Sequence, residues 1–417
     1  MDDKLALFGG TPVRSEPFSA WPYFDDRERQ HLLKALESRN WGGYPFPSML
    51  AERFGRKFAK AHGANFGVPC ANGSVTMEIA LQAMGIQAGD EVIVPAYTFA
   101  ATATCAIRTN AVPVFVDVEA RNYCMDPALV EAAITPKTRA IIPVHLGSSI
   151  ADMDRILEIA KKHGLVVIED CAHAHGGQWR GMGVGSMGDF GSFSLQSSKL
   201  MTSGEGGVLT VKDDVLRQKV MSLINCGRKE PGYDGFEEQL FGGNFRMSEL
   251  QIAVALAQTE RLEEVTDKRA KMHAYFKETL HAQVQGLRVL DTDPRVTRLH
   301  CYQTIMRYDP QAFAGVHRDR VLEALAAEGV HFHGDFYEPL YRIDIMNAKS
   351  SRWPMLRERY GEGILGHPEI CCPVTEKAAY HESVWMHYPY LSGTQKDVDD
   401  VVAAIVKVQK NAADLRK

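Results

Sequence analysis

The fold of this chain is decided by Leu165-Val-Val-Ile-Glu-Asp170, an apolar run that ends on an acid, and by Phe193-Ser-Leu-Gln-Ser-Ser-Lys-Leu-Met-Thr-Ser-Gly-Glu-Gly-Gly207. Short, nearly continuous apolar runs are typical of strands that are buried on both faces. Here they alternate with helical patterns, which predicts a mostly parallel α/β sheet covered by helices. Asp170 and Lys199 both follow strand-like runs, and ligands bind at the carboxyl ends of such strands.

The rest of the chain continues this alternation. Helices are predicted at 24–38, 48–62, 75–84, 99–110, 151–163, 247–280, 317–328, 353–360 and 397–412. Strands are predicted at 91–95, 113–117, 140–145, 165–170 and 302–307, and around Val289. Gly164 is placed to end the helix before it, since glycine adopts the left-handed conformation at little cost.

The helical pattern at 247–280 contains no internal glycine or proline. At this length we expect it to bend or break. We also expect it to lead from an N-terminal segment and large domain, residues 1–262, into a small C-terminal α/β domain, residues 263–417.

Lys199 and Asp170 together suggest one chemistry. A lysine can form a Schiff base with pyridoxal phosphate (PLP), and a carboxylate can hold a proton on the pyridine nitrogen so that the ring withdraws electrons. Alone, Asp170 is read more simply as a helix cap. Beside Lys199 the cofactor interpretation is favoured, because a protonated ring nitrogen inside a protein needs a buried carboxylate.

Other residues fit weaker parts of the same hypothesis. The turn Asn72-Gly-Ser74 opens a helix, and backbone N–H groups at a helix start bind phosphate. Ser194 could donate its hydroxyl to that phosphate. Phe99, after a strand, could lie on a pyridine ring, although core packing is the commoner role of such a residue. His173 and His175 lack the further ligands that zinc needs, so no metal is expected.

Composition and charge exclude several classes of function. The chain has 417 residues with a net charge of −5, so no general basic field favours nucleic acid or an anionic membrane. Its eight cysteines form no C-x-x-C pair, which favours reduced thiols and a cytoplasmic location. Neither a signal peptide nor a membrane-spanning run is expected. Gly181-x-Gly-x-Gly185 lacks the spacing of a dinucleotide-binding loop and is read as a turn.

The motifs, taken in order, resemble the DegT/DnrJ/EryC1/StrS aminotransferases, over about residues 6 to 410. The resemblance rests on Asn72-Gly-Ser74, Val94-Pro-Ala-Tyr-Thr-Phe99, Val114-Phe-Val-Asp117, Ile168-Glu-Asp-Cys-Ala-His173, Phe193-Ser-Leu-x-x-x-Lys199, Gly204-Glu-Gly-Gly207 and Gly243-Asn-Phe-Arg-Met247. It implies the aspartate aminotransferase-like fold (fold type I), PLP as cofactor, and a homodimer with active sites shared between subunits.

The resemblance also implies roles for single residues. Lys199 would carry the cofactor, Asp170 would pair with the pyridine nitrogen, and His173 would contact the ring hydroxyl. Phe99 would stack on the ring. The phosphate contacts would come from Gly73, Ser74, Val75 and Ser194, and from Asn244 of the other subunit.

Within the family, Gln196 and the segment 382–387 resemble the branch of scyllo-inosose-type aminotransferases and 3-amino-5-hydroxybenzoate synthases. This implies transfer of an amino group from glutamine or glutamate to a cyclic keto-polyol or keto-sugar, through a Lys199 aldimine and pyridoxamine phosphate, in antibiotic or polysaccharide biosynthesis. An aromatising synthase, a nucleotide-linked keto-sugar aminotransferase and a PLP-binding regulator remain alternatives. Gly147-Ser-Ser149 departs from the family, which often has an aromatic residue after His145-Leu146.

Overall fold

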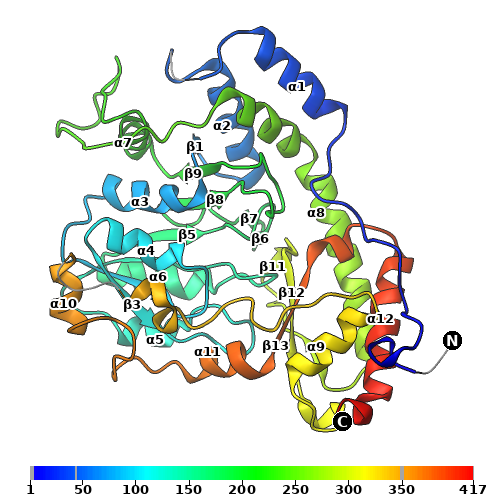
Figure 1. The fold of residues 1–417 in the computed structure, drawn as a ribbon. Coiled ribbons are helices and arrows are strands. Elements are labelled where there is room, and N and C mark those ends of the chain that lie inside the picture. Colours follow the sequence, from blue (N-terminus) through cyan, green and yellow to red (C-terminus); the bar gives the residue numbers. More distant parts are fainter. Residues whose placement is uncertain (1–3, 43–44, 348–351, 417) are drawn as a thin grey trace.

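The computed structural model describes residues 4–42, 45–347 and 352–416. Figure 1 shows a large α/β body joined by one long helix to a smaller part that holds both chain termini. Among the described residues, no helix is both long enough and apolar enough to cross a bilayer.

A seven-stranded sheet forms the centre of the large body. Its strands, in spatial order, are β1 (Phe66–Cys70), β9 (Gly207–Val211), β8 (Phe190–Ser194), β5 (Val166–Asp170), β4 (Thr138–Ile141), β2 (Glu91–Pro95) and β3 (Val112–Val116). The five strands from β8 to β3 are parallel, whereas β9 runs antiparallel to both of its neighbours. The predicted mostly parallel α/β fold is therefore confirmed.

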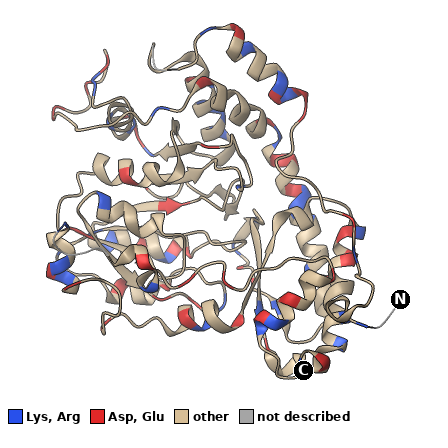
Figure 2. Ribbon diagram, viewed as in Figure 1, with Lys and Arg blue, Asp and Glu red and all other residues tan. Residues whose placement is uncertain are grey.

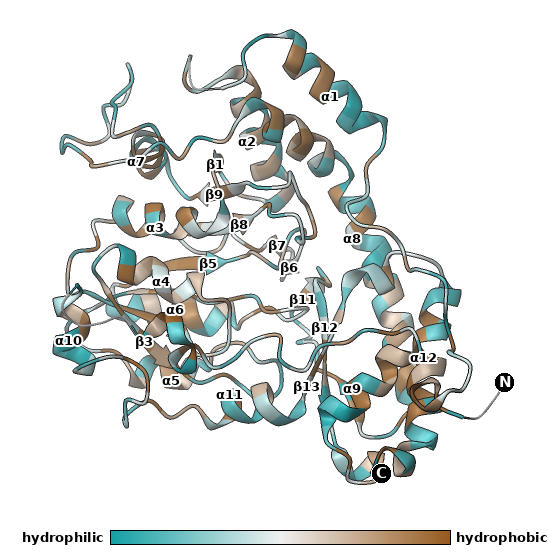
Figure 3. Cartoon of the chain, in the orientation of Figure 1, coloured by the Kyte–Doolittle hydropathy of each residue, from teal (hydrophilic) through white to brown (hydrophobic). Residues whose placement is uncertain are grey.

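Helices cover both faces of the sheet. The helices are α1 (Asp26–Glu37), α2 (Met49–His62), α3 (Gly73–Ala83), α4 (Ala101–Arg108), α5 (Pro127–Ala132), α6 (Met153–His163), α7 (Asp214–Ile224), α8 (Glu249–Gln283), α9 (Arg318–Ala327), α10 (Pro354–Tyr360), α11 (Pro373–Lys377) and α12 (Gln395–Lys410). One core contains side chains of α2, α5, α6 and α8, and the other contains those of α3, α4, α7 and α10. Ile93 of β2 points into the first core, and Val92 and Val94 point into the second. The strands are accordingly hydrophobic along their length (Figure 3).

The predicted helices and strands are found within a few residues of their expected positions. Gly164 ends α6 in the left-handed conformation, with φ of 66°, as its place after the apolar pattern predicts. The break expected in the helix at 247–280 is not found, because α8 runs unbroken over 35 residues. Ser248 and Gln251 cap its start reciprocally, which supplies partners for backbone groups that a helix start leaves free.

The smaller part has its own sheet and core. Strands β10 (Leu287–Val289), β12 (Gln303–Tyr308) and β13 (Ser383–His387) form it, and α9 and α12 pack against it. A third sheet joins β11 (Val296–Arg298) to the hairpin of β6 (Gln178–Trp179) and β7 (Met182–Gly183). The Gly181-containing stretch is thus a hairpin turn, as predicted.

Two segments cross between the parts. Leu5 belongs to the core of the smaller part, and the carboxylate of Glu328 accepts hydrogen bonds from the backbone of Ala6 and Val13. In the other direction, Tyr360 donates its hydroxyl proton to the carbonyl of Pro113 in the large body. We propose a division near residue 262, inside α8, with these two segments exchanged across it.

Charges of both signs are interspersed over the chain (Figure 2).

The buried carboxylate of Glu169 holds several backbone groups in the large body. Glu169 accepts backbone hydrogen bonds from Gly185, Met187 and Gly188, each at 2.8 Å. The Nε2 of His145 lies 3.1 Å from the same carboxylate. Both atoms lie near the thiol of Cys171, in a group that could hold a metal. The carboxylate is already occupied by these four hydrogen bonds, so we interpret the group as structural.

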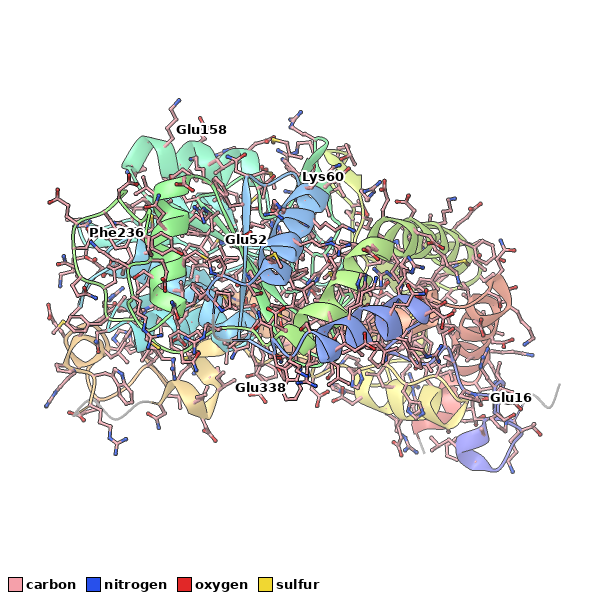
Figure 4. The ribbon with its side chains drawn as sticks, turned by 90° about the horizontal axis from the view of Figure 1, so that it is seen from above. Glu16, Glu52, Lys60, Glu158, Phe236 and Glu338 are labelled. Atoms are coloured by element: carbon pink, nitrogen blue, oxygen red, sulfur yellow. The ribbon has the colours of Figure 1, made fainter. Side chains whose placement is uncertain are left out.

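Replacing Glu169 by glutamine should lower the stability of the fold without touching the surface. The amide nitrogen cannot accept the hydrogen bonds of buried N–H groups, which should cost roughly 2 to 4 kcal/mol. We expect a thermal unfolding midpoint several degrees lower. Glu158, which projects from α6 into solvent (Figure 4), offers the matched control. An equal effect of Glu158→Gln would contradict the role given to Glu169.

Candidate active site

A cavity of about 1040 Å³ opens at the carboxyl ends of β2, β5 and β8. Eight of the nine residues predicted for the site line it: Gly73, Ser74, Val75, Phe99, Asp170, His173, Ser194 and Lys199. The ninth, Asn244, does not line it. The sheet topology brings these residues together, because parallel strands end at one edge.

Lys199 lies in the loop that follows β8. Its Nζ is 4.8 Å from the centre of the Tyr302 ring, a cation–π distance. Burial lowers the pKa of the Lys199 amine to about 8, and the nearby Asp170 carboxylate opposes that shift. A substantial fraction of this amine is therefore neutral near physiological pH, which is the form that attacks a carbonyl.

Asp170 ends β5 beneath the cavity. Its two oxygens accept one hydrogen bond each, from the backbone N–H of Ala172 at 3.1 Å and from the hydroxyl of Thr102 at 2.9 Å. Burial raises the pKa of the carboxyl group, and no ion pair to it occurs among the described residues. A cationic group bound above Asp170 would supply the missing counter-charge.

The start of α3 forms a close-packed turn against the sheet. A Cβ on Gly73 would lie 2.7 Å from the Cβ of Ser194, and one on Gly207 would lie 2.5 Å from the backbone of Asn72. Both positions therefore need glycine. The Asn72 side chain caps α3 by accepting the N–H of Val75. The N-terminus of α3, with Ser74 and Ser194 beside it, is suited to an anion such as a phosphate.

His173 is held by contacts on both ring nitrogens. The backbone N–H of Gly147 donates to Nδ1 at 3.3 Å, and the hydroxyl of Tyr337 lies 3.2 Å from Nε2. Its ring also stacks on Tyr302, with centroids 4.2 Å apart. Burial lowers the pKa of His173 well below its ordinary value, so the ring is neutral. His175, by contrast, is buried beside Phe193 and does not line the cavity.

Phe99 is 58% exposed although it lines the cavity. A phenylalanine with an uncovered face in a cavity can stack on a flat ring. The core-packing role weighed for it from the sequence is therefore not the one that the structure gives it.

Gln196, Trp385 and Arg246 do not present free side-chain groups to the cavity. Gln196 lines the cavity, but its Oε1 accepts from the backbone and hydroxyl of Ser198, so its amide braces the Lys199 loop. Trp385 is fully buried in β13. Arg246 lines another hollow and donates to Asn225. Asn244 is exposed, on the same segment as Arg246.

Sequence reasoning missed Thr102, Tyr302 and Tyr337. Thr102 lies on α4 and reaches Asp170 across the sheet edge, whereas Tyr302 and Tyr337 come from the smaller part of the chain. None belongs to a local motif. The hydroxyls of Thr98 and Thr102 lie 3.2 Å apart, with Thr98 in the loop before α4. A spacing of four residues is too common to single out Thr102.

Chemically, the cavity combines an amine of lowered pKa, a buried carboxylate with no ion-pair partner among the described residues, an exposed aromatic face and an anion-binding helix start. This set can hold a flat heterocycle that carries a phosphate at one end and a basic nitrogen at the other. It can also form a covalent bond from Lys199 to a carbonyl group.

Comparison with known proteins agrees with this geometry. Residues 22–406 match the model of the DegT/DnrJ/EryC1/StrS aminotransferase family. The chain is 50% identical, over 100% of both chains, to a putative L-glutamine:3-amino-2,3-dideoxy-scyllo-inosose aminotransferase of Streptoalloteichus tenebrarius. It is 37% identical, again over 100% of both chains, to the L-glutamine:2-deoxy-scyllo-inosose aminotransferase of the same organism.

Among solved structures, the chain is similar to a 3-amino-5-hydroxybenzoic acid synthase. The two share 31% sequence identity with a TM-score of 0.82, over 95% of this chain and 100% of the synthase. The matched family, the curated relatives and the shared fold agree. The chain therefore belongs to the DegT/DnrJ/EryC1/StrS aminotransferase family.

Proposed function

We propose that this enzyme binds PLP at Lys199 and transfers an amino group from L-glutamine to an inosose-type cyclitol ketone that already carries an amine. The observation that carries the proposal is the composition of the Lys199 cavity. It offers the groups that PLP needs, and the rest of its charged lining is mostly acidic. Two curated relatives, at 50% and 37% identity, are named for glutamine and inosose substrates, which supports the same class.

The residues around the cavity fit PLP. Asp170 would hold the ring nitrogen, Phe99 would stack on the ring, and His173 would lie beside the ring hydroxyl. The phosphate would lie at the start of α3, near Gly73, Ser74, Val75 and Ser194. When bound, PLP supplies an aldehyde that reacts with amines and a ring that withdraws electrons from the carbon losing its proton.

The chain's own residues then have defined tasks. Lys199, with a pKa of about 8, can accept a proton at Nζ from the amino donor and return it to the product. Asp170 would place a negative charge against the ring nitrogen, and Thr102 orients its carboxylate by donating a hydrogen bond. Positioned proton transfer of this kind is worth about 10²–10⁴-fold in rate.

The charges of the cavity indicate the class of acceptor. Its cations are Lys199 and Arg108, and Arg108 is paired with Glu78. Three further carboxylates, of Glu205, Asp335 and Glu338, line the cavity without an ion-pair partner among the described residues. Glu338 lies at the margin of the molecule (Figure 4). A nucleotide diphosphate would be repelled here, because its phosphates need cations. An ammonium group on the acceptor would be attracted.

The comparisons favour the same choice. The relative named for the amine-bearing inosose is 50% identical to this chain, against 37% for the one named for 2-deoxy-scyllo-inosose. The 3-amino-5-hydroxybenzoic acid synthase is more distant, at 31%. An aromatising synthase and a nucleotide-sugar aminotransferase are therefore less favoured.

We further propose that the active enzyme is a homodimer with shared sites. Asn244 does not line the cavity of its own chain, so a contact with the phosphate would have to reach a second copy. Large apolar side chains are exposed near Asn244: Met49 is 87% exposed, Phe241 is 95% exposed, and Trp41 is exposed as well. The backbone carbonyl of Trp41 accepts a hydrogen bond from Glu249 at the start of α8. A contiguous patch of such residues would mark an interaction surface.

Borohydride treatment of the PLP-loaded enzyme tests the cofactor site. Because Lys199 has the lowered pKa and lines the same cavity as Asp170, peptide mass mapping should place a pyridoxyl group on Lys199. Lys199→Arg keeps a cation there but cannot bond to the aldehyde, and should carry no pyridoxyl group at this peptide. A pyridoxyl group on another lysine of the wild-type chain would refute the assignment.

An acceptor comparison tests the substrate class. With L-glutamine as donor, product formation by mass spectrometry should give the highest kcat/KM for 3-amino-2,3-dideoxy-scyllo-inosose, ahead of 2-deoxy-scyllo-inosose. Asp335→Asn should reduce this preference a few-fold, in line with the modest strength of exposed ion pairs. Added salt should reduce it too. If only nucleotide-linked keto-sugars react, the proposed acceptor is wrong.

Hybrid dimers test the shared site. A Lys199→Ala chain and an Asn244→Ala chain should each be weak alone, but a mixed dimer contains one site with both residues intact. We expect activity to rise on mixing once mass spectrometry shows that subunits have exchanged. Two Lys199→Ala chains tagged differently provide the control. Exchange with no gain in activity would argue against Asn244 acting across the interface.

A further inference from the structure

The hydroxyl group of Tyr337 faces His173 in the cavity. Tyr337 lines the cavity, and its hydroxyl oxygen lies 3.2 Å from His173 Nε2. The direction of that hydrogen bond depends on which ring nitrogen of His173 carries the proton. The rest of the structure determines this.

The proton of His173 must lie on Nε2. The backbone N–H of Gly147 can only donate, and it points at Nδ1 from 3.3 Å, so Nδ1 is the acceptor nitrogen. Burial lowers the pKa of His173, so the ring is neutral and has a single proton. Nε2–H therefore donates to the Tyr337 oxygen, and the O–H of Tyr337 is left to donate elsewhere.

The position of Gly147 is rigidly set. It has φ of 63°, and a Cβ there would lie 2.6 Å from Cδ1 of Ile305 in β12. Its carbonyl accepts the N–H of Tyr302 at 3.2 Å. Glycine is thus required at 147, and its N–H is fixed toward His173. The family often has an aromatic side chain at this position, whereas this chain has Gly147. The backbone N–H of Gly147 sets the tautomer of His173.

The neighbouring Tyr302 does not have a free hydroxyl proton. Ser198 donates its own hydroxyl proton to Gln196 Oε1, so the Tyr302 hydroxyl, 3.3 Å from Ser198 Oγ, is the donor of that pair. Tyr337 is therefore the tyrosine in this cavity whose proton is available to a ligand. Burial raises the pKa of Tyr337 well above its ordinary value, so the proton stays in place at neutral pH.

We infer that Tyr337 is a substrate-contacting residue that donates a hydrogen bond to an oxygen of the cyclitol ketone, with Gly147 and His173 as the positioning residues that orient it. The inference rests on the proposed function. Between the two substrates, the competing oxygen ligand is the carboxylate of glutamine. It is disfavoured at Tyr337, because Asp335 and Glu338 flank the tyrosine and have no cationic partner among the described residues.

The first test needs no substrate. NMR of isotope-labelled histidine in the full-length, cofactor-free protein should show His173 neutral and protonated at Nε2 across the neutral pH range. Tyr337→Phe should keep this tautomer, since Gly147 sets it, but should move the Nε2–H signal. A His173→Gln chain assigns the resonance. A proton on Nδ1, or a cationic ring, would overturn the inference.

The second test separates the two substrates. Loss of one hydrogen bond should make Tyr337→Phe bind and use the cyclitol ketone about 3- to 10-fold more weakly, with the glutamine half-reaction unchanged. Tyr97→Phe is the matched control, because the Tyr97 hydroxyl is bonded to Ser383 and Tyr97 does not line the cavity.

The outcomes distinguish the inference from the proposed function. Equal use of the ketone by Tyr337→Phe and wild type would overturn the inference alone. A larger effect on the use of glutamine than on the use of the ketone would mean that Tyr337 contacts the amino donor. That result would also overturn the inference. If the wild type uses no cyclitol ketone, the proposed function fails, and the substrate part of the inference fails with it, whatever tautomer the NMR shows.

Discussion

The active site depends on the buried carboxylate of Asp170, which has no ion-pair partner in the part of the chain that the structure describes. Such a carboxylate is costly, and the cost is limited by two hydrogen bonds, from Ala172 and Thr102. Both donors come from elements that the sheet places at its carboxyl edge. The site is thus prepared for a cation to be bound above the strand, and Lys199 opposite has its pKa lowered by the same burial. Burial at the carboxyl edge of the sheet therefore raises the pKa of Asp170 and lowers the pKa of Lys199.

The two parts of the chain meet at the cavity. Gly147, from the large body, accepts the N–H of Tyr302 from the smaller part, and its own N–H holds His173. Tyr337 also comes from beyond α8 and reaches His173. A change in how the parts pack would therefore alter the histidine contacts, the wall of the cavity and the surroundings of Lys199 together.

Much of the local structure could be predicted from the sequence because its causes are local. Gly164 ends α6 because glycine accepts positive φ, and the apolar run to Pro95 forms β2 as predicted. The break expected in α8 did not occur. Helix patterns this long usually end earlier, but α8 packs against α1, α2 and α12 along its course and is supported by these tertiary contacts.

The sequence by itself determined the mostly parallel sheet, the strand that ends at Asp170, the segment of Lys199 that follows a strand, and the turn at Gly73. Each follows from hydrophobic periodicity or from a residue's own backbone preferences. Only the tertiary structure decided that Tyr337 meets His173, that Thr102 meets Asp170, and that Asn244 lies away from its own cavity. Tyr337 and His173 are 164 residues apart in the sequence, and Thr102 and Asp170 are 68 residues apart. No local pattern records them, because they arise from the packing of distant elements, which has no period in the sequence.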